Sequence, residues 1–84
     1  MNSKHRKTLE AIFMDPVRAD IKWSDVEALF VACGGTVEQG RGSRVCVEID
    51  GLFAHFHRPH PKPDTDKGAV KSVRRFIENV GVKP

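Results

Sequence analysis

The chain has 84 residues, 39% of them hydrophobic and 30% charged, with a formal net charge of +3 at pH 7. This length fits one small domain, and the spread of apolar residues excludes a disordered chain. No apolar run approaches the roughly 20 residues of a membrane span, and the N-terminal segment lacks the apolar region of a signal peptide, so a cytoplasmic protein is expected. Cys33 and Cys46 lack a CxxC spacing, which favours two free, buried thiols over a disulfide.

Charge is unevenly distributed along the chain. Residues 1–50 carry seven Lys/Arg and eight Asp/Glu, whereas residues 51–84 carry seven and three. Three histidines, His55, His57 and His60, also lie in the second part. A basic half on a small protein indicates a polyanionic partner such as nucleic acid, and it fits a merely solubilising surface equally well.

A short helix is predicted at the start of the chain, over residues 3–14. Ser3 is its expected cap, and Asp15-Pro16 ends it because the residue before a proline avoids the helical region. Residues 17–22 are expected to be a linker. The apolar residues with helical spacing are Leu9, Ile12 and Phe13.

A second helix is predicted over residues 23–35. Ser24 and Glu27 match a capping box at its start, and Gly34-Gly35 provides a left-handed stop at its end. Its apolar face consists of Val26, Leu29, Phe30 and Cys33.

Three strands follow. Residues 36–42 are predicted as a short strand that enters a glycine-bounded turn, and residues 43–49 and 52–58 alternate between apolar and polar positions. Asp50-Gly51 between them is a strong two-residue hairpin signal. The apolar face of this hairpin consists of Val45, Val47, Ile49, Leu52, Ala54 and Phe56.

A loop and a final helix complete the chain. Residues 59–66 are rich in proline and are expected to be a loop. Residues 66–81 are predicted as a helix capped by Asp66 and ended by Gly81. Its buried stripe consists of Ala69, Val70, Val73, Phe76, Ile77 and Val80. The order α-α-β-β-β-α predicts an α+β domain with a three-stranded antiparallel sheet, helices on one face and solvent on the other.

The hairpin register brings polar side chains together. A two-residue turn at Asp50-Gly51 makes His57 the cross-strand neighbour of Arg44, and His55 that of Cys46, on the solvent-facing side. His60 lies in the loop just beyond. A guanidinium binds phosphate and an imidazole titrates near neutral pH, so this group can supply the base, the acid and the cation needed to cleave RNA through its 2′-hydroxyl.

Two plainer interpretations remain open for these residues. Polar residues point outward on any half-buried sheet, which for His55 is the favoured interpretation. A zinc site built from Cys46, His55 and His57 is the other alternative, although their spacing is weak evidence for one.

The final helix carries a basic face, made of Lys67, Lys71, Arg74 and Arg75. This face can bind phosphates, or it can be a solvated surface with Arg74 and Glu78 in an i,i+4 ion pair.

Residues 23–82 together resemble the HicA family of bacterial type II toxins. The resemblance rests on "WSDVEALFVACGGTV", on Gly42-Ser43 opening a hydrophobic strand, on "RPHP", and on the closing "KGAVKSVRRFIENVGV". It implies a double-stranded-RNA-binding-domain-like fold, a metal-independent endoribonuclease that cleaves mRNA without a cofactor, and a HicB-like antitoxin as partner. Residues 1–20 are then an additional N-terminal helix and linker, and residues 21–84 the HicA-like domain.

The chain departs from the family at one position. The family usually carries its catalytic histidine directly after this Gly-Ser, where Arg44 stands here, and arginine stays protonated at any working pH. Either a neighbouring histidine is the base, His57 first and His60 second, or the protein is a catalytically weakened relative. The residues expected to bind RNA are Arg41, Ser43, Arg44, Arg58, Lys67, Lys71, Arg74 and Arg75.

Overall fold

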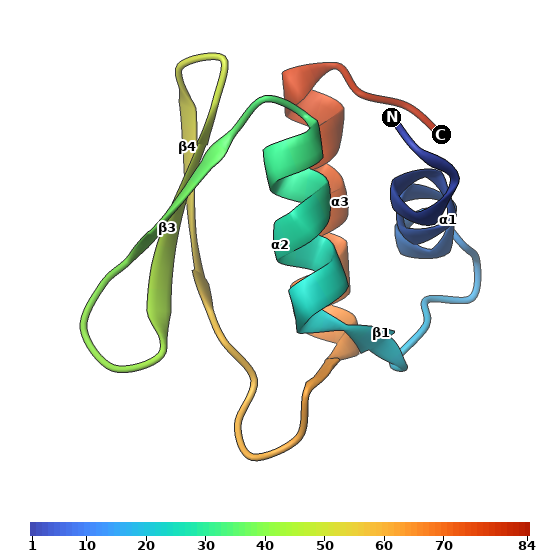
Figure 1. Cartoon of the computed structure of the whole chain (residues 1–84). Helices are drawn as coiled ribbons and strands as arrows, with labels where there is room; N and C mark the ends of the chain where they lie inside the picture. The colour runs from blue at the N-terminus through green and yellow to red at the C-terminus, as the bar shows by residue number, and fades with distance from the viewer.

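The computed structural model describes residues 1–84 and contains one three-stranded antiparallel sheet. Its strands are β2 (Thr36–Gln39), β3 (Arg44–Ile49) and β4 (Leu52–His57), in the spatial order β2-β3-β4. The helices α2 (Trp23–Ala32) and α3 (Lys67–Val80) stand beside the sheet, and α1 (Ser3–Ile12) lies on their far side (Figure 1). The predicted α+β class, the order of the three helices and of the three strands of this sheet, and the packing of helices on one face of it are therefore confirmed, and they are consistent with a double-stranded-RNA-binding-domain-like fold.

The hairpin between β3 and β4 has the predicted register. Asp50 and Gly51 both have positive φ, 52° and 81°, which a tight turn of this twist requires and which an Asp-Gly pair tolerates. Ile49 pairs with Leu52, and five residues further along each strand Arg44 pairs with His57 at the other end of the hairpin. The core and the solvent-facing side of the sheet are thus the ones expected from the sequence.

An aromatic cluster joins the sheet to the helices. Phe56 from β4 stacks on Phe30 from α2, with ring centroids 5.6 Å apart and an interplanar angle of 20°. Trp23 and Phe76 pack around this pair at centroid distances of 5.7 and 6.2 Å from Phe56. Leu52 was expected on the same buried face but is 42% exposed, because it lies beside the turn at the end of the hairpin.

Two predicted helix caps are wrong. Asn2, not Ser3, caps α1, by accepting a hydrogen bond from the His5 backbone N–H at 2.9 Å. The Ser24–Glu27 capping box does not form, because α2 already begins at Trp23 and no side chain caps its first turn. The carboxylate of Glu27 points instead to partners described below.

Two segments expected to be irregular contain a short strand pair. β1 (Ile21–Lys22) pairs antiparallel with β5 (Asp64–Thr65), and the Trp23 backbone N–H donates to the Pro63 carbonyl at 2.9 Å. A strand of two residues has no periodicity to recognise, so neither the linker nor the loop indicated it. This pairing ties the end of the loop after β4 to the start of α2.

The remaining local predictions agree well with the structure. Asp66 caps α3 by accepting from the Ala69 backbone N–H at 2.8 Å, and Gly81 ends it with a φ of 95°. Cys33 and Cys46 are free as predicted, although they are half-buried rather than buried, and burial raises the pKa of the Cys33 thiol.

The packing at Gly35 provides a stability test. A Cβ at this position would lie 2.5 Å from Ile49 Cγ1 and 2.8 Å from the Glu48 carbonyl oxygen. We expect Gly35→Ala to lower the free energy of unfolding by about 1–3 kcal/mol, the usual cost of overpacking. Gly68→Ala is the matched control in α3, where the nearest atom is 3.4 Å away and alanine should stabilise the helix by about 0.5–1 kcal/mol. Equal urea-unfolding curves for the two variants would contradict this account.

Candidate functional site

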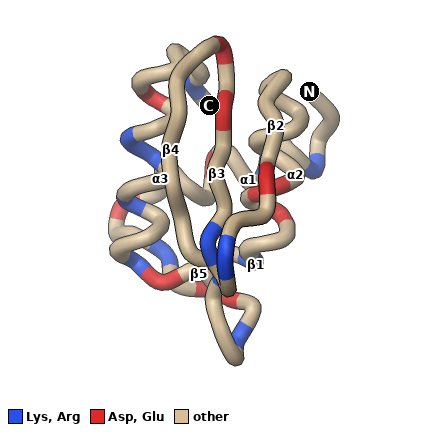
Figure 2. Tube along the Cα trace, turned by 90° about the vertical axis from the view of Figure 1, so that its left-hand side faces the viewer, with Lys and Arg blue, Asp and Glu red and all other residues tan.

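The solvent-facing side of the sheet is electrically polarised. Arg44 begins β3 and Arg41 lies in the loop just before it, whereas Glu48 and Asp50 lie at the opposite end, beside the turn. Figure 2 shows this separation along β3, with Lys/Arg at the end near β5 and Asp/Glu at the other. An anionic ligand would therefore be drawn to the end of the sheet at which β3 begins and β4 finishes.

Two loops meet at this basic end. The loop between β2 and β3 is closed by a hydrogen bond from the Arg44 backbone N–H to the Arg41 carbonyl at 3.0 Å, and Gly42 within it has a φ of 58°. The Arg58 backbone N–H donates to the Ser43 carbonyl at 2.7 Å, which joins this loop to the segment that follows β4. The backbone therefore holds the glycine-bounded loop and the histidine-containing loop together.

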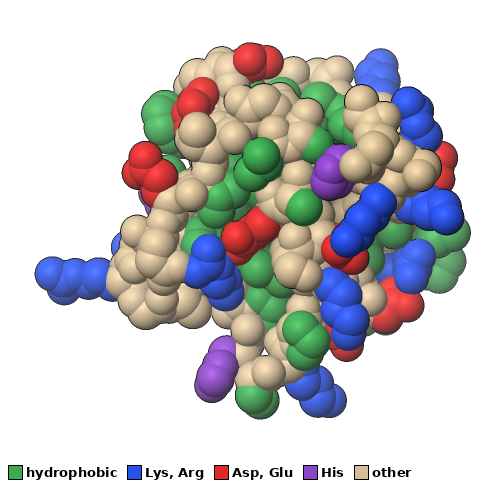
Figure 3. Space-filling model, in the orientation of Figure 1, with side chains coloured by type: hydrophobic (Ala, Val, Ile, Leu, Met, Phe, Trp, Pro, Cys, Tyr) green, Lys and Arg blue, Asp and Glu red, His purple; other side chains and the backbone are tan.

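A pocket of about 540 Å³ opens between these two loops; its lining residues are Gly42, Ser43, Arg58, Pro59 and His60. In Figure 3, a histidine and Lys/Arg side chains project from the lower end of the molecule, where these loops lie in Figure 1. We call this cavity the Ser43 pocket. It contains two of the residues predicted to bind RNA and one predicted to be catalytic.

His57 lies at the edge of the Ser43 pocket. Its Nδ1 is 3.3 Å from the Ser43 hydroxyl oxygen, and its cross-strand partner is Arg44, both of them exposed. When Nδ1–H donates to this hydroxyl, the lone pair of Nε2 faces solvent, as a general base requires. The structure thus brings Ser43, Arg44 and His57 together, with His60 in the adjoining wall, whereas His55 lies further along β4 opposite Cys46.

Arg58 is held by other side chains. Its Nε and Nη2 donate to the two carboxylate oxygens of Glu27 at 2.8 and 3.2 Å, and its Nη1 donates to Gln39. Trp23 Nε1 donates to the same carboxylate. The hydrogen bond with Glu27 raises the pKa of Arg58. These four side chains, here called the Arg58 network, connect β2 and α2 to the loop after β4.

The basic face of α3 is less continuous than predicted. Lys67, Lys71 and Arg75 are exposed, but Arg74 is half-buried, and its Nε and Nη2 donate to the carbonyls of Ile12 and Met14 at 2.8 Å each. The proposed Arg74–Glu78 ion pair does not form. The guanidinium of Arg74 therefore binds the backbone at the end of α1.

The geometry gives the zinc alternative no support. No group of three or more His, Cys, Asp or Glu side chains lies where it could hold a metal ion. Cys46 and His55 are cross-strand partners, but no third ligand converges on them.

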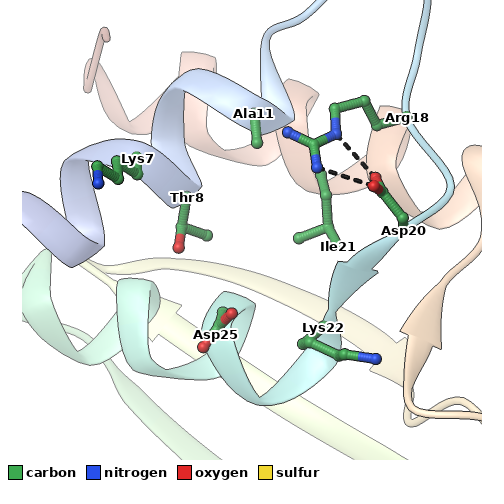
Figure 4. Close-up of a pocket in the computed structure, with 8 residues that line it drawn as sticks. All are labelled: Lys7, Thr8, Ala11, Arg18, Asp20, Ile21, Lys22 and Asp25. Carbon is green, nitrogen blue, oxygen red and sulfur yellow. Dashed lines mark hydrogen bonds and ion pairs between the residues drawn. The ribbon is translucent and has the colours of Figure 1, made fainter.

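A separate pocket of about 180 Å³ lies beside α1 (Figure 4). Most of its charged groups have ion-pair partners. Arg18 and Asp20 form two hydrogen bonds of 2.7 and 2.9 Å, and Lys22 binds Asp64, outside the pocket, at 2.9 Å. This pairing makes the pocket a weaker candidate for an anionic ligand than the Ser43 pocket.

Sequence reasoning missed Trp23, Glu27 and Gln39 as parts of the site. Glu27 has a local interpretation, the capping box, and nothing in its neighbourhood relates it to Arg58, which is 31 positions away. No signal in the sequence points to this role, and only the observed start of α2 at Trp23 shows that Glu27 is not part of a capping box.

Fold and site together define a small α+β domain with a basic, histidine-containing pocket at one end of a three-stranded sheet. Residues 23–82 match the family described as "HicA toxin of bacterial toxin-antitoxin", and this chain belongs to that family. It is a toxin of a bacterial toxin–antitoxin system, with an antitoxin as its partner. No curated protein and no solved structure gives a significant match. None of the helices is both long and apolar enough to cross a membrane.

The Arg58 network makes a testable contribution to stability. We expect Glu27→Ala to lower the urea midpoint of unfolding, because it leaves the donors of Trp23 and Arg58 without their shared acceptor. Asp20→Ala removes a carboxylate that binds only the exposed Arg18, and it should have the smaller effect. A larger effect of Asp20→Ala would show that the network does not stabilise the fold.

Proposed function

We propose that this toxin is an mRNA-cleaving endoribonuclease that acts from the Ser43 pocket and needs no metal ion or cofactor. The observation that carries this proposal is that His60 lines the Ser43 pocket, while His57 contacts Ser43 of that pocket and has Arg44 as its cross-strand neighbour. An arginine and two imidazoles are the groups that cleavage through the 2′-hydroxyl requires, and family membership supplies the context of a toxin.

The proposed reaction is an internal transfer at one phosphodiester. His57 accepts the proton of the 2′-hydroxyl through Nε2, and the 2′-oxygen forms a bond to phosphorus. The bond from phosphorus to the 5′-oxygen breaks, that oxygen takes up a proton from His60, and a 2′,3′-cyclic phosphate remains. Arg44 stabilises the negative charge on the phosphoryl oxygens. His60 is the second candidate for the base, in which case the two histidines exchange roles.

RNA binding is proposed to extend beyond the pocket. Arg41 and Arg44 at the end of the sheet, with Lys67, Lys71 and Arg75 on α3, supply positive charge for the phosphates. A HicB-like antitoxin in the cytoplasm would oppose this activity by masking the toxin.

A second candidate function is favoured by one specific residue. Arg44 occupies the position where the family usually has its catalytic histidine, and arginine cannot accept a proton. The alternative is therefore a weakened or inactive module that binds RNA, a HicB-like antitoxin, or both.

Catalysis is tested by cleavage of a defined RNA in excess chelator. We expect His57→Ala or His60→Ala to reduce the rate by about 10²–10⁴, the usual cost of losing a general acid or base. His55→Ala is the matched control, because His55 is an exposed histidine of the strand that carries His57, is paired with Cys46 and has no contact with Ser43, and it should retain full activity. Full activity of both pocket variants would remove this mechanism. No cleavage by the native protein would favour the non-catalytic alternative.

RNA binding is tested by titration at several salt concentrations. We expect Arg44→Ala and Arg75→Ala each to weaken binding and to reduce the slope of log affinity against log salt by about 1, as the loss of one phosphate contact should. Arg6→Ala removes the same charge from α1, on the far side of the helices, and should leave both quantities unchanged. Equal slopes for all three variants would show that net charge, not these positions, determines binding.

A further inference from the structure

A second pocket adjoins the Ser43 pocket. It measures about 270 Å³, and its lining residues are Trp23, Ser24, Glu27, Arg58, Pro59 and Pro63. Arg58 and Pro59 line both cavities, so these two residues alone form the ridge between them. A ligand that extends across Arg58 and Pro59 would occupy both cavities.

The guanidinium of Arg58 on this ridge is fixed by side-chain hydrogen bonds. Glu27 occupies the Nε–Nη2 edge of the Arg58 guanidinium, and Gln39 occupies one donor of Nη1. A guanidinium whose edge is taken in this way is poorly available for bidentate binding of a phosphate, but its planar face is held in place. Planar guanidinium faces and apolar rings are the surfaces on which unpaired RNA bases stack.

The remaining walls of this second pocket suit the rim of a nucleobase. Pro59 and Pro63 supply apolar surface, and the bond from the Trp23 backbone N–H to the Pro63 carbonyl fixes that wall. A carboxylate has about four acceptor positions. Trp23 and Arg58 use three of those on Glu27, which leaves one on Oε1 for an N–H of the base.

We propose that this second pocket, the base pocket, binds one unpaired nucleobase of a single-stranded RNA whose adjacent phosphate lies in the Ser43 pocket. The inference rests on the proposed function, since it names how the RNA is held there. It also assigns Arg58 a role different from that of Arg44: Arg58 stacks on a base, and Arg44 faces a phosphate.

The test measures binding, independently of cleavage. The probes are a five-nucleotide single-stranded RNA, methylated on every 2′-oxygen so that it cannot be cut, and five versions that each lack one base. Stacking of one base is typically worth about 5- to 150-fold in affinity. We expect the native toxin to bind at least one of the versions that lack a base more weakly than the complete RNA by a factor in this range.

Trp23 provides a direct reporter, because it is the only tryptophan of the chain and lines the base pocket. The complete RNA should shift its indole N–H resonance, and ribose 5-phosphate, which has no base, should not. Arg58→Lys keeps the positive charge but lacks the planar guanidinium, so it should remove the preference for RNA with all its bases. Ser24→Phe fills the base pocket and leaves the hydrogen bonds of Arg58 intact, so it should also remove this preference. This second variant keeps the test valid if Arg58→Lys does not fold.

Equal affinity of the native toxin for all six RNAs would overturn the base pocket, as would a Ser24→Phe variant that still discriminates between them. Either result alongside normal cleavage would leave the proposed function intact. A base preference in a protein that does not cleave would retain the base pocket and remove only the catalysis. No binding of any RNA would overturn both proposals.

Discussion

The pairing of β3 with β4 is the constraint on which both the core and the site depend. Asp50 and Gly51 adopt positive φ values, and this turn places Ile49 opposite Leu52 and, at the far end, Arg44 opposite His57. A slip of one residue would turn every side chain of one strand to the other face. Phe56 would then point away from the aromatic cluster, and His57 would point into it. The register thus couples the stability of the hydrophobic core to the position of the polar groups, although the two lie on opposite faces of the sheet.

Arg58 and Arg74 show that tertiary structure determines which positive charges are available to a ligand. Arg58 and Arg74 both belong to the basic second half of the sequence, but one is fixed by a carboxylate from α2 and the other by two carbonyls at the end of α1. Arg44 and Arg75 make no such side-chain bonds and keep their guanidinium groups in solvent. The number of positive charges near a site therefore overestimates the number that can bind a ligand.

Regular local patterns determined which parts of this fold were predictable. The alternation in β3 and β4, the Asp-Gly turn and the amphipathic stripe of α3 each lie within a few residues of sequence, and the family resemblance over residues 23–82 is confirmed. The β1–β5 pair and the Arg58 network join residues that are far apart in sequence and carry no periodicity of their own. The role of Glu27 in this network was missed for a further reason. The residue fits a local capping-box pattern, and that pattern gave no cause to look for a distant partner. The catalytic and RNA-binding roles stay predictions.

The attachment of α1 has a consequence for the order in which this chain folds. The side chain that binds the carbonyls at the end of α1, Arg74, lies 62 positions beyond Ile12. Contacts of such large sequence separation form late, because the intervening chain must first be ordered. The packing of α1 against α2 spans a much shorter stretch of chain and forms earlier. The two sides of α1 are thus fixed at different stages, and its last turn is secured only when α3 is in place.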